Sequence, residues 1–289
     1  MSVSGSWRWV LAFSLALMLV ACSLVQTVYN QAANLAYLQF NRAFHLDDDQ
    51  ADRLKRQLQA YLDWHRRDEL PTYVRLMGAA AHDAKGPVTA GLACERRVAI
   101  EAALRRALDR GVPMMAELLR TLQPEQLAQL LTYIDERNAR FARDYLQSDQ
   151  SERDEALGRF ATKWAEVFYG SLSEAQRQKL VRAVLAGPLS AQDVHAEVRR
   201  TQAAFVRIAR RAVQERPPQD EIEAALRTLV AQLFDPPTEA RQAQLDKWRD
   251  AGCRLVATTH DSATPVQRSH ASDTLRDWAE DLRILSTQR

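Results

Sequence analysis

The chain has 289 residues, of which 46% are hydrophobic, and this is enough to build one large domain or two small ones. Its 9 glycines and 10 prolines are too few for turn-rich β architectures or glycine-rich phosphate loops. The net charge of +2 lacks the basic excess of a nucleic-acid-binding protein, so we expect no nucleic-acid partner.

Residues 1–21 have the layout of a secretory signal peptide. A short polar segment with a single charge, Arg8, precedes an apolar run over residues 9–20. A spanning helix needs about 20 apolar residues, so this run is short for one. The alternative is an uncleaved anchor, because residues 9–25 carry no charge.

The apolar run ends in Leu19-Val20-Ala21-Cys22, which resembles the bacterial lipobox. The resemblance implies cleavage between Ala21 and Cys22 and a covalent lipid on Cys22, with no other cofactor. A single acyl chain binds membranes only marginally, whereas a cysteine with several chains anchors a protein stably. Ser23 follows the cysteine; in such lipoproteins serine favours transfer to the outer membrane and aspartate favours retention in the inner membrane. We therefore predict a periplasm-facing protein, anchored at the outer rather than the inner membrane.

Residues 23–41 hold no charged side chain, and their aromatic and aliphatic residues fall at helical spacing. The spacing predicts a helix that begins almost at the lipid and holds the following domain close to the membrane. The alternative is that this segment is simply a buried first core helix.

The rest of the chain shows one amphipathic helix after another, with apolar residues three and four positions apart. The pattern predicts an all-α fold, an irregular bundle of about eight to ten helices, because such helices must pack together to be stable. The predicted breaks between helices are Lys85-Gly86-Pro87, Gly111-Val112-Pro113, Gln123-Pro124, Gly187-Pro188, Pro217-Pro218, Pro236-Pro237 and Thr264-Pro265.

A loose repeat, Leu-x-x-x-Gln, stands at three predicted helix starts: Leu46–Gln50, Leu122–Gln126 and Leu172–Gln176. Asp47 and Ser173 are suited to cap the exposed amides of the following helices. Phe234–Glu239 is a related start. The copies lie 76 and 50 residues apart, and this unequal spacing argues against a regular solenoid.

The stretch Leu35-Ala-Tyr-Leu-Gln-Phe-Asn-Arg-Ala-Phe-His-Leu-Asp-Asp-Asp-Gln50, so soon after a lipobox, resembles a family of Gram-negative lipoproteins of unknown function. The resemblance covers most of the mature chain and implies a helical lipoprotein, but it supplies no functional residues. Leu172-Ser-Glu-Ala-Gln-Arg177 is similar to the Leu-Thr-x-x-Gln motif of the Spy/CpxP type of periplasmic chaperones, with serine in place of threonine. A helix-start signal explains the same residues.

Cys94 and Cys253 are the only cysteines besides Cys22. An exported chain lies in an oxidising compartment, where two cysteines commonly pair, so a disulfide between them is one expectation and two free thiols are the other. Redox catalysis is not expected, because the Cys-x-x-Cys motif is absent.

The six histidines form no His-x-x-x-His pair or Cys/His cluster, so we predict no metal site. His260 and His270 are expected to be solvated loop residues, and the aromatic residues to be mostly core. No hydrolase or nucleotide-binding motif occurs, so no catalytic residue and no small-molecule ligand are predicted.

The sequence thus predicts a signal peptide (1–21), a lipidated N-terminus with a membrane-proximal helix (22–45) and a helical periplasmic domain (46–289). A break near residue 187 would divide that domain into two sub-bundles. The favoured function is a non-enzymatic role in which the protein binds an envelope protein or a client, or has a structural role in the envelope. The alternatives are a Spy/CpxP-like chaperone and an envelope hydrolase whose catalytic residues are dispersed in sequence.

Overall fold

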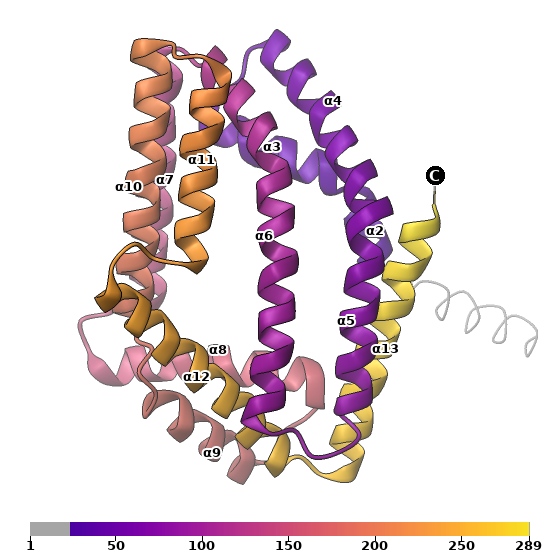
Figure 1. Cartoon of the computed structure of the whole chain (residues 1–289). Coiled ribbons are helices and arrows are strands. Elements are labelled where there is room, and N and C mark those ends of the chain that lie inside the picture. The colour runs from indigo at the N-terminus through magenta and orange to yellow at the C-terminus, as the bar shows by residue number, and fades with distance from the viewer. Residues whose placement is uncertain (1–23, 289) are drawn as a thin grey trace, which may run out of the picture.

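The computed structural model describes residues 24–288, which are almost entirely helical and include no strand (Figure 1). This confirms the predicted all-α multi-helix bundle. The helices are α2 (Leu24–Asn30), α3 (Ala32–Phe44), α4 (Asp48–Trp64), the π-helical turn η1 (His65–Glu69), α5 (Leu70–Asp83), α6 (Ala90–Thr121), α7 (Pro124–Tyr145), α8 (Gln150–Tyr169), α9 (Glu174–Leu185), α10 (Ala191–Glu215), α11 (Gln219–Phe234), α12 (Glu239–Ser262) and α13 (Pro265–Thr287).

Six of the seven predicted breaks separate helices in the structure, but the one at Pro113 is wrong. Pro113 lies inside α6, which continues unbroken through it. A proline within a helix has no N–H and leaves the carbonyl four residues earlier without its usual donor. Here that carbonyl belongs to Asp109, and Arg227 of α11 donates a hydrogen bond to it at 3.3 Å. A contact from another helix therefore offsets what the local sequence disfavours.

A second proline, Pro71, is accommodated by a change of helix type. It follows the π-helical turn η1, in which the amide of Leu70 donates to the carbonyl of His65 five residues earlier. A π-turn of this kind inserts one extra residue into a helix and is found mostly as a single turn. As a result α4, η1 and α5 form one continuous helical segment, as α2 and α3 nearly do across Gln31.

The helices are arranged around α6, which runs through the middle of the molecule in Figure 1. On one side α5 and α13 pack along each other, and on the other α7, α10 and α11 stand together. The lower end in this view is formed by α8, α9 and α12. α8 packs against α9 and α13, and α12 packs against α6.

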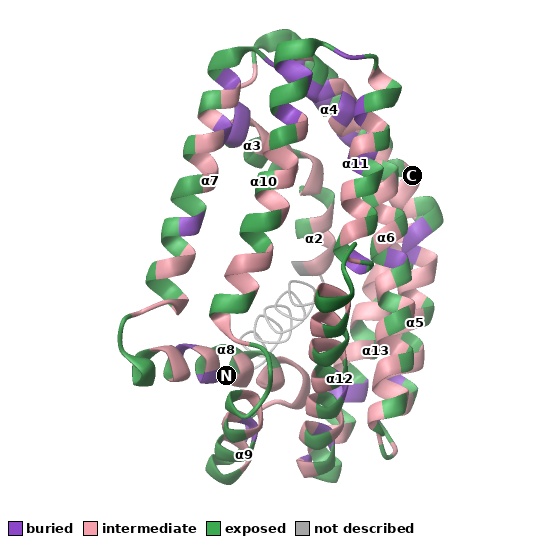
Figure 2. Ribbon diagram, turned by 60° about the vertical axis from the view of Figure 1, so that its left-hand side comes forward, coloured by how far each residue is buried: buried purple, intermediate pink, exposed green. Residues whose placement is uncertain are grey.

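The main hydrophobic core lies near one end of this arrangement, where α3, α6, α7, α10 and α11 meet (Figure 2). Its buried residues are Ala43, Phe44, Val112, Ala116, Leu118, Leu119, Leu122, Leu130, Ala209, Ala212, Val213, Ile222 and Leu226. The helices extend well beyond this region, and most of their residues there are half-buried or exposed.

The Leu-x-x-x-Gln starts are paired in space. Gln50 and Gln126 exchange amide hydrogen bonds of 3.1 and 2.6 Å at the beginnings of α4 and α7. Each carbonyl oxygen also accepts from the backbone N–H of its own N-cap residue, Asp47 or Gln123. Asp47 caps α4 as predicted, because its carboxylate accepts a hydrogen bond from the backbone N–H of Gln50 at 2.8 Å.

The same arrangement occurs at the opposite end of the molecule, between Gln176 of α9 and Gln267 of α13. In both pairs the side-chain NH₂ of each glutamine also donates to a backbone carbonyl of the other helix start. That carbonyl lies two residues before the N-cap residue of the helix that carries the partner glutamine. Those carbonyls belong to His45 and Thr121 in one pair, and to Ser171 and Ser262 in the other. Each glutamine pair therefore joins two helix–turn–helix corners that are 76 or 91 residues apart in sequence.

Gln267 was not among the predicted repeats, because Ala263 stands where the other three copies have leucine. The capping residue Thr264 and the proline after it still mark a helix start, and Ala263 is buried like Leu122 and Leu172. A search for any small or apolar residue followed by a capping residue and Gln three positions later would have found it.

Candidate functional site

The predicted lipidation and cleavage residues, Cys22 and Ala21, lie outside the described residues, as does the leader. The first described helix, α2, begins directly after them at Leu24. No helix within residues 24–288 is both long and apolar enough to cross a membrane.

α2 is held against the body of the protein by three polar contacts. Gln26 donates to the Asp281 carboxylate of α13 at 2.9 Å, and Arg66 donates to the Asn30 side chain at 3.1 Å. The Tyr29 hydroxyl lies 2.9 Å from His65 Nδ1. The segment after the predicted anchor is therefore docked on η1 and α13.

Tyr29 belongs to a cluster of aromatic side chains around η1, together with Tyr61, His65 and Tyr73. Burial raises the pKa of Tyr29 and of Tyr61 to about 12 and lowers the pKa of His65. The phenols are then protonated and the imidazole is neutral at pH 7, so these groups act as hydrogen-bonding and packing partners.

Glu69 lies in the same turn and is buried, although its sequence neighbours Arg66, Arg67 and Asp68 are charged. Both of its carboxylate oxygens accept from Arg106 of α6, at 2.8 and 3.1 Å. A buried carboxylate needs such a partner, because an unpaired charge would be strongly destabilising away from water.

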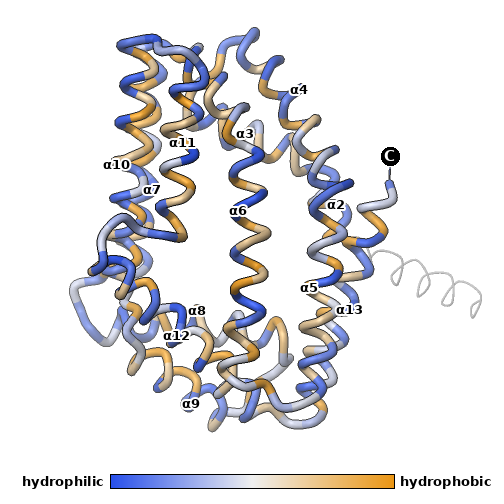
Figure 3. Tube along the Cα trace, viewed as in Figure 1, coloured by the Kyte–Doolittle hydropathy of each residue, from blue (hydrophilic) through white to orange (hydrophobic). Residues whose placement is uncertain are grey.

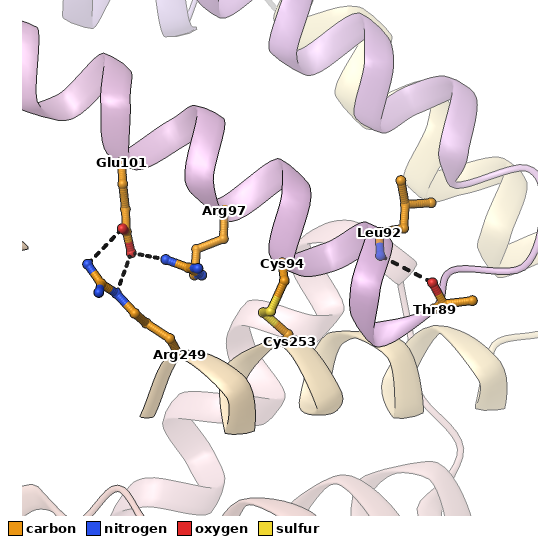
Figure 4. The surroundings of a disulfide bond; sticks show 7 residues. All are labelled: Thr89, Leu92, Cys94, Arg97, Glu101, Arg249 and Cys253. Carbon is orange, nitrogen blue, oxygen red and sulfur yellow. Dashed lines mark hydrogen bonds and ion pairs between the residues drawn. A yellow bond between two sulfur atoms is a disulfide. The ribbon is translucent and has the colours of Figure 1, made fainter. Parts of the chain in front are cut away.

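Cys94 of α6 and Cys253 of α12 are brought together in a disulfide, with their Cα atoms 5.3 Å apart (Figure 4). Farther along the same interface between α6 and α12, Arg249 donates to both carboxylate oxygens of Glu101, at 3.2 and 2.9 Å. The bond and the ion pair fix α12 against the first half of α6.

His260 is buried within α12, so the expectation of a solvated loop residue is wrong. Its Nδ1 lies 3.1 Å from the Tyr169 hydroxyl and its Nε2 lies 2.8 Å from the carbonyl oxygen of Gly86. These contacts fix a neutral imidazole that donates from Nε2 and accepts at Nδ1. Burial lowers the pKa of His260. His270 also lies in a helix, α13, where its Nδ1 is 2.9 Å from the carbonyl oxygen of Phe168. In the described part of the chain, no group of three or more histidine, cysteine or carboxylate side chains is arranged to hold a metal.

The surface of the described residues includes a groove between α10 and α11 and another between α8 and α9. One, of about 320 Å³, lies between α10 and α11 and has an apolar floor that includes Ile208, Ile222 and Leu229. The other, of about 1010 Å³, is an open groove between α8 and α9 whose walls carry charges of both signs. Neither is the deep pocket with converging polar side chains that is typical of an enzyme site.

The most unusual feature is apolar surface on the core-facing sides of several helices. On α6, Ile100, Leu104 and Leu108 continue the helical stripe that reaches the core at Met115 and Leu118. Val198 of α10 lies on the stripe of Phe205 and Ala209, and Leu233 of α11 lies on the stripe of Ile222 and Leu226. The stripes are buried near the core and exposed farther from it. Figure 3 shows hydrophobic residues along the whole length of α6.

A series of aromatic side chains adds to the exposed apolar residues between α7 and α8. Phe141 contacts Tyr145 of α7 in a tilted arrangement, and Tyr145, Phe160 and Trp164 continue the series onto α8 with edge-to-face contacts, the ring centroids lying 5.1 to 6.4 Å apart. We call the whole set the inner apolar surface; its residues are Ile100, Leu104, Leu108, Phe141, Tyr145, Phe160, Trp164, Val198 and Leu233. All except Phe141 and Tyr145 are 40% to 50% exposed.

Phe160 and Trp164 are half-exposed, so they depart from the expectation that the aromatic residues are mostly core. Their spacing marks only which side of α8 is apolar; it does not say whether another helix covers that side. Exposed aromatic side chains in contiguous apolar surface are typical of protein interfaces, where Trp and Tyr contribute most to binding.

Residues 42–233 match the model of a family described as a family of unknown function, DUF6279. This segment contains all nine residues of the inner apolar surface. No curated protein and no solved structure matches the chain.

Proposed function

Because the chain belongs to the family of unknown function DUF6279, whose model covers residues 42–233, we propose a function from its surface: non-enzymatic binding of another polypeptide. The protein would be anchored by a lipid on Cys22 at the periplasmic face of the outer membrane. Its inner apolar surface would hold an apolar segment of an envelope protein.

The observation that carries this proposal is the exposure of apolar stripes from α6, α8, α10 and α11. Each half-exposed aliphatic or aromatic side chain would stabilise a complex by losing its contact with water. Apolar side chains that are exposed on several helices usually mark an interaction site.

The charged residues around this surface suit a polypeptide partner better than a lipid tail. Arg105 pairs with Asp235, and Arg97 with Glu101, on the α6 turns that carry Ile100 and Leu104. An apolar centre with a charged rim is the usual composition of a protein interface.

A photo-crosslinking amino acid at position 104 or 98 of α6, in intact cells, tests the binding surface. Leu104 and Val98 are both exposed aliphatic residues, but Val98 lies on another side of the helix. We expect discrete protein adducts of the same mass in independent experiments from position 104 and none from position 98. The proposal fails if the two positions give the same pattern.

A Spy/CpxP-like chaperone is the second candidate, favoured by the width of the surface and by the paired helix-start motifs. The purified lipidated chain should then slow the aggregation of several unrelated unfolded proteins. Leu104→Asp together with Trp164→Asp should abolish this activity, and Val98→Asp should leave it intact. Protection of no unfolded protein, with a single adduct in cells, would favour one specific partner.

The lipid anchor has its own test. Mass spectrometry of the purified protein should show a chain that begins at Cys22 with added acyl mass, and Cys22→Ser should leave the membrane fraction. An intact Met1, or a Cys22→Ser variant that stays bound to the membrane, would show that the anchor is wrong.

A further inference from the structure

α2 and α3 expose one long side of their surface to solvent. The exposed residues along it recur once in each helical turn, singly or as adjacent pairs: Thr27, Val28, Gln31, Asn34, Leu35, Leu38 and Gln39. The three aliphatic members, Val28, Leu35 and Leu38, are 47% to 51% exposed. We call these seven residues the outer α2–α3 face.

The opposite side of the two helices is fixed to the protein, so the outer α2–α3 face cannot turn inward. Phe44 is buried in the core and Phe40 packs against it. Lys55 lies 4.7 Å from the centre of the Tyr37 ring, and Tyr29 contacts His65. The aliphatic residues therefore point away from the core.

The outer α2–α3 face also differs from the other exposed helix surfaces in its charge. Its seven residues carry no charge; Arg42, which is exposed and lies on the same side one turn after Leu38, is the first ionic side chain after the predicted anchor. In the whole chain 26% of residues are charged, and the exposed sides of the later helices carry many ion pairs. An uncharged surface avoids the cost of bringing ionic groups close to hydrocarbon.

The predicted lipid attachment lies next to this face. Cys22 precedes Leu24 by two residues, which span at most about 7 Å when extended. Residues 24–44 form about 31 Å of helix, so Leu38 lies about 21 Å along the axis from the start of α2. An upright helix would lift Leu38 out of the lipid headgroups, whereas a helix lying along the membrane brings all three aliphatic residues into contact.

We propose that the outer α2–α3 face is a membrane-contact surface: α2 and α3 lie along the lipid headgroup region, with Val28, Leu35 and Leu38 inserted into it. This inference rests on the proposed lipid anchor on Cys22 and assigns an orientation to the anchored protein. Helices that lie in the interface insert their apolar side by about 5 to 10 Å.

The test uses the full lipidated chain in vesicles of phosphatidylethanolamine and phosphatidylglycerol, some carrying a nitroxide on the acyl chain. Leu35→Cys or, as the control, Val266→Cys on α13 receives a fluorophore. Cys22 is blocked by lipid, and Cys94 and Cys253 are paired. Val266 is also an exposed aliphatic residue. We expect the nitroxide to quench position 35 at least about threefold more than position 266, since only an inserted residue reaches it.

A second variant tests the chemistry of the contact. Leu38→Glu, in a chain labelled at Val28→Cys, should reduce the quenching at position 28, whereas Val266→Glu should not change it. Equal quenching at positions 35 and 266 would overturn the proposal, as would a photo-crosslinker at position 35 that attaches to a protein instead of lipid.

The two proposals fail in different ways. A chain that floats with the vesicles but shows no quenching at position 35 is anchored without this contact, so only the orientation is wrong. A chain that does not float has no lipid anchor, and both the anchor and the orientation are then wrong.

Discussion

Glutamine stands at the four paired helix starts because its amide has both a donor and an acceptor. The oxygen of Gln126 accepts from its own N-cap amide and from Gln50, while its NH₂ donates to Gln50 and to the His45 carbonyl. Glutamate could not donate and leucine could do neither. Both glutamines of this pair are buried, so a missing partner cannot be replaced freely by water.

Gln126→Leu is therefore expected to lower the free energy of unfolding by about 2 to 3 kcal/mol, because it removes both bonds to the Gln50 side chain and the bonds that Gln126 makes with the His45 carbonyl and the Gln123 N–H. Urea denaturation followed by circular dichroism measures this change. Gln178→Leu is the control: Gln178 is exposed and bonds only to Glu174, so we expect a change within about 0.5 kcal/mol. Equal effects of the two substitutions would contradict this role for the glutamine pairs.

His260 gives the fold a pH dependence of known sign. Burial lowers its pKa in the folded protein below the ordinary value of 6.5. At a pH between the pKa of folded His260 and the pKa of 6.5 in the unfolded chain, the unfolded chain binds more protons than the folded protein. The free energy of unfolding is therefore highest above pH 6.5 and falls as the pH drops toward the folded-state pKa. His65 contributes in the same direction.

Urea midpoints measured from pH 7.5 down to 5 should therefore decline, and His260→Gln should decline less steeply while being less stable at pH 7.5. His82→Gln is the control, because His82 is exposed. A midpoint that rises as the pH falls over this range would contradict the assignment of His260 as a buried neutral imidazole.

At the scale of the helices, α6 illustrates how tertiary contacts offset a locally unfavourable sequence. Pro113 should end it, but Arg227 provides the donor that the Asp109 carbonyl lacks. Its first half has an exposed apolar stripe and little buried surface of its own. The disulfide to α12 and the Glu101–Arg249 ion pair hold this half in place.

Reduction of the Cys94–Cys253 bond should lower the free energy of unfolding by about 2 to 5 kcal/mol, because the bond closes a long loop in the unfolded chain. The two cysteines are 159 residues apart. Urea curves with and without reductant measure the difference. A variant with both Cys94→Ala and Cys253→Ala should match the reduced protein and not respond to reductant. Two free thiols in the unreduced, denatured chain would contradict the bond.

At the scale of the whole molecule, the two proposed contacts use different parts of the bundle. The outer α2–α3 face points away from the core, and the inner apolar surface continues the sides of α6, α10 and α11 that face it. A protein held on a membrane by its outer α2–α3 face would keep its inner apolar surface available to bind a polypeptide chain.

Ser23→Asp is expected to move the protein from the outer to the inner membrane fraction, because the residue after the lipidated cysteine directs sorting in the lipoproteins that this leader resembles. Membrane separation on a sucrose gradient followed by immunoblotting measures the distribution. Gln178→Asp, an acidic substitution at an exposed position of α9, is the control and should leave the sorting unchanged. A Ser23→Asp protein that stays in the outer membrane would contradict the sorting prediction.

Much of the fold could be predicted because its signals are local. Helical periodicity, capping residues such as Asp47 and Ser173, and prolines at positions 124 and 265 are set by neighbours within one turn. The continuity of α6 through Pro113 and the burial of His260 depend on residues more than 90 positions away, so no local pattern could reveal them.

The sequence by itself determined the all-α class, most helix boundaries and the uncharged segment after Cys22, because each depends on side chains close together along the chain. Only the tertiary structure decided that Gln50 meets Gln126, that Cys94 meets Cys253, and that Trp164 is exposed. The physical reason is that an apolar stripe specifies which side of a helix avoids water, while the packing of distant helices decides whether that side is covered.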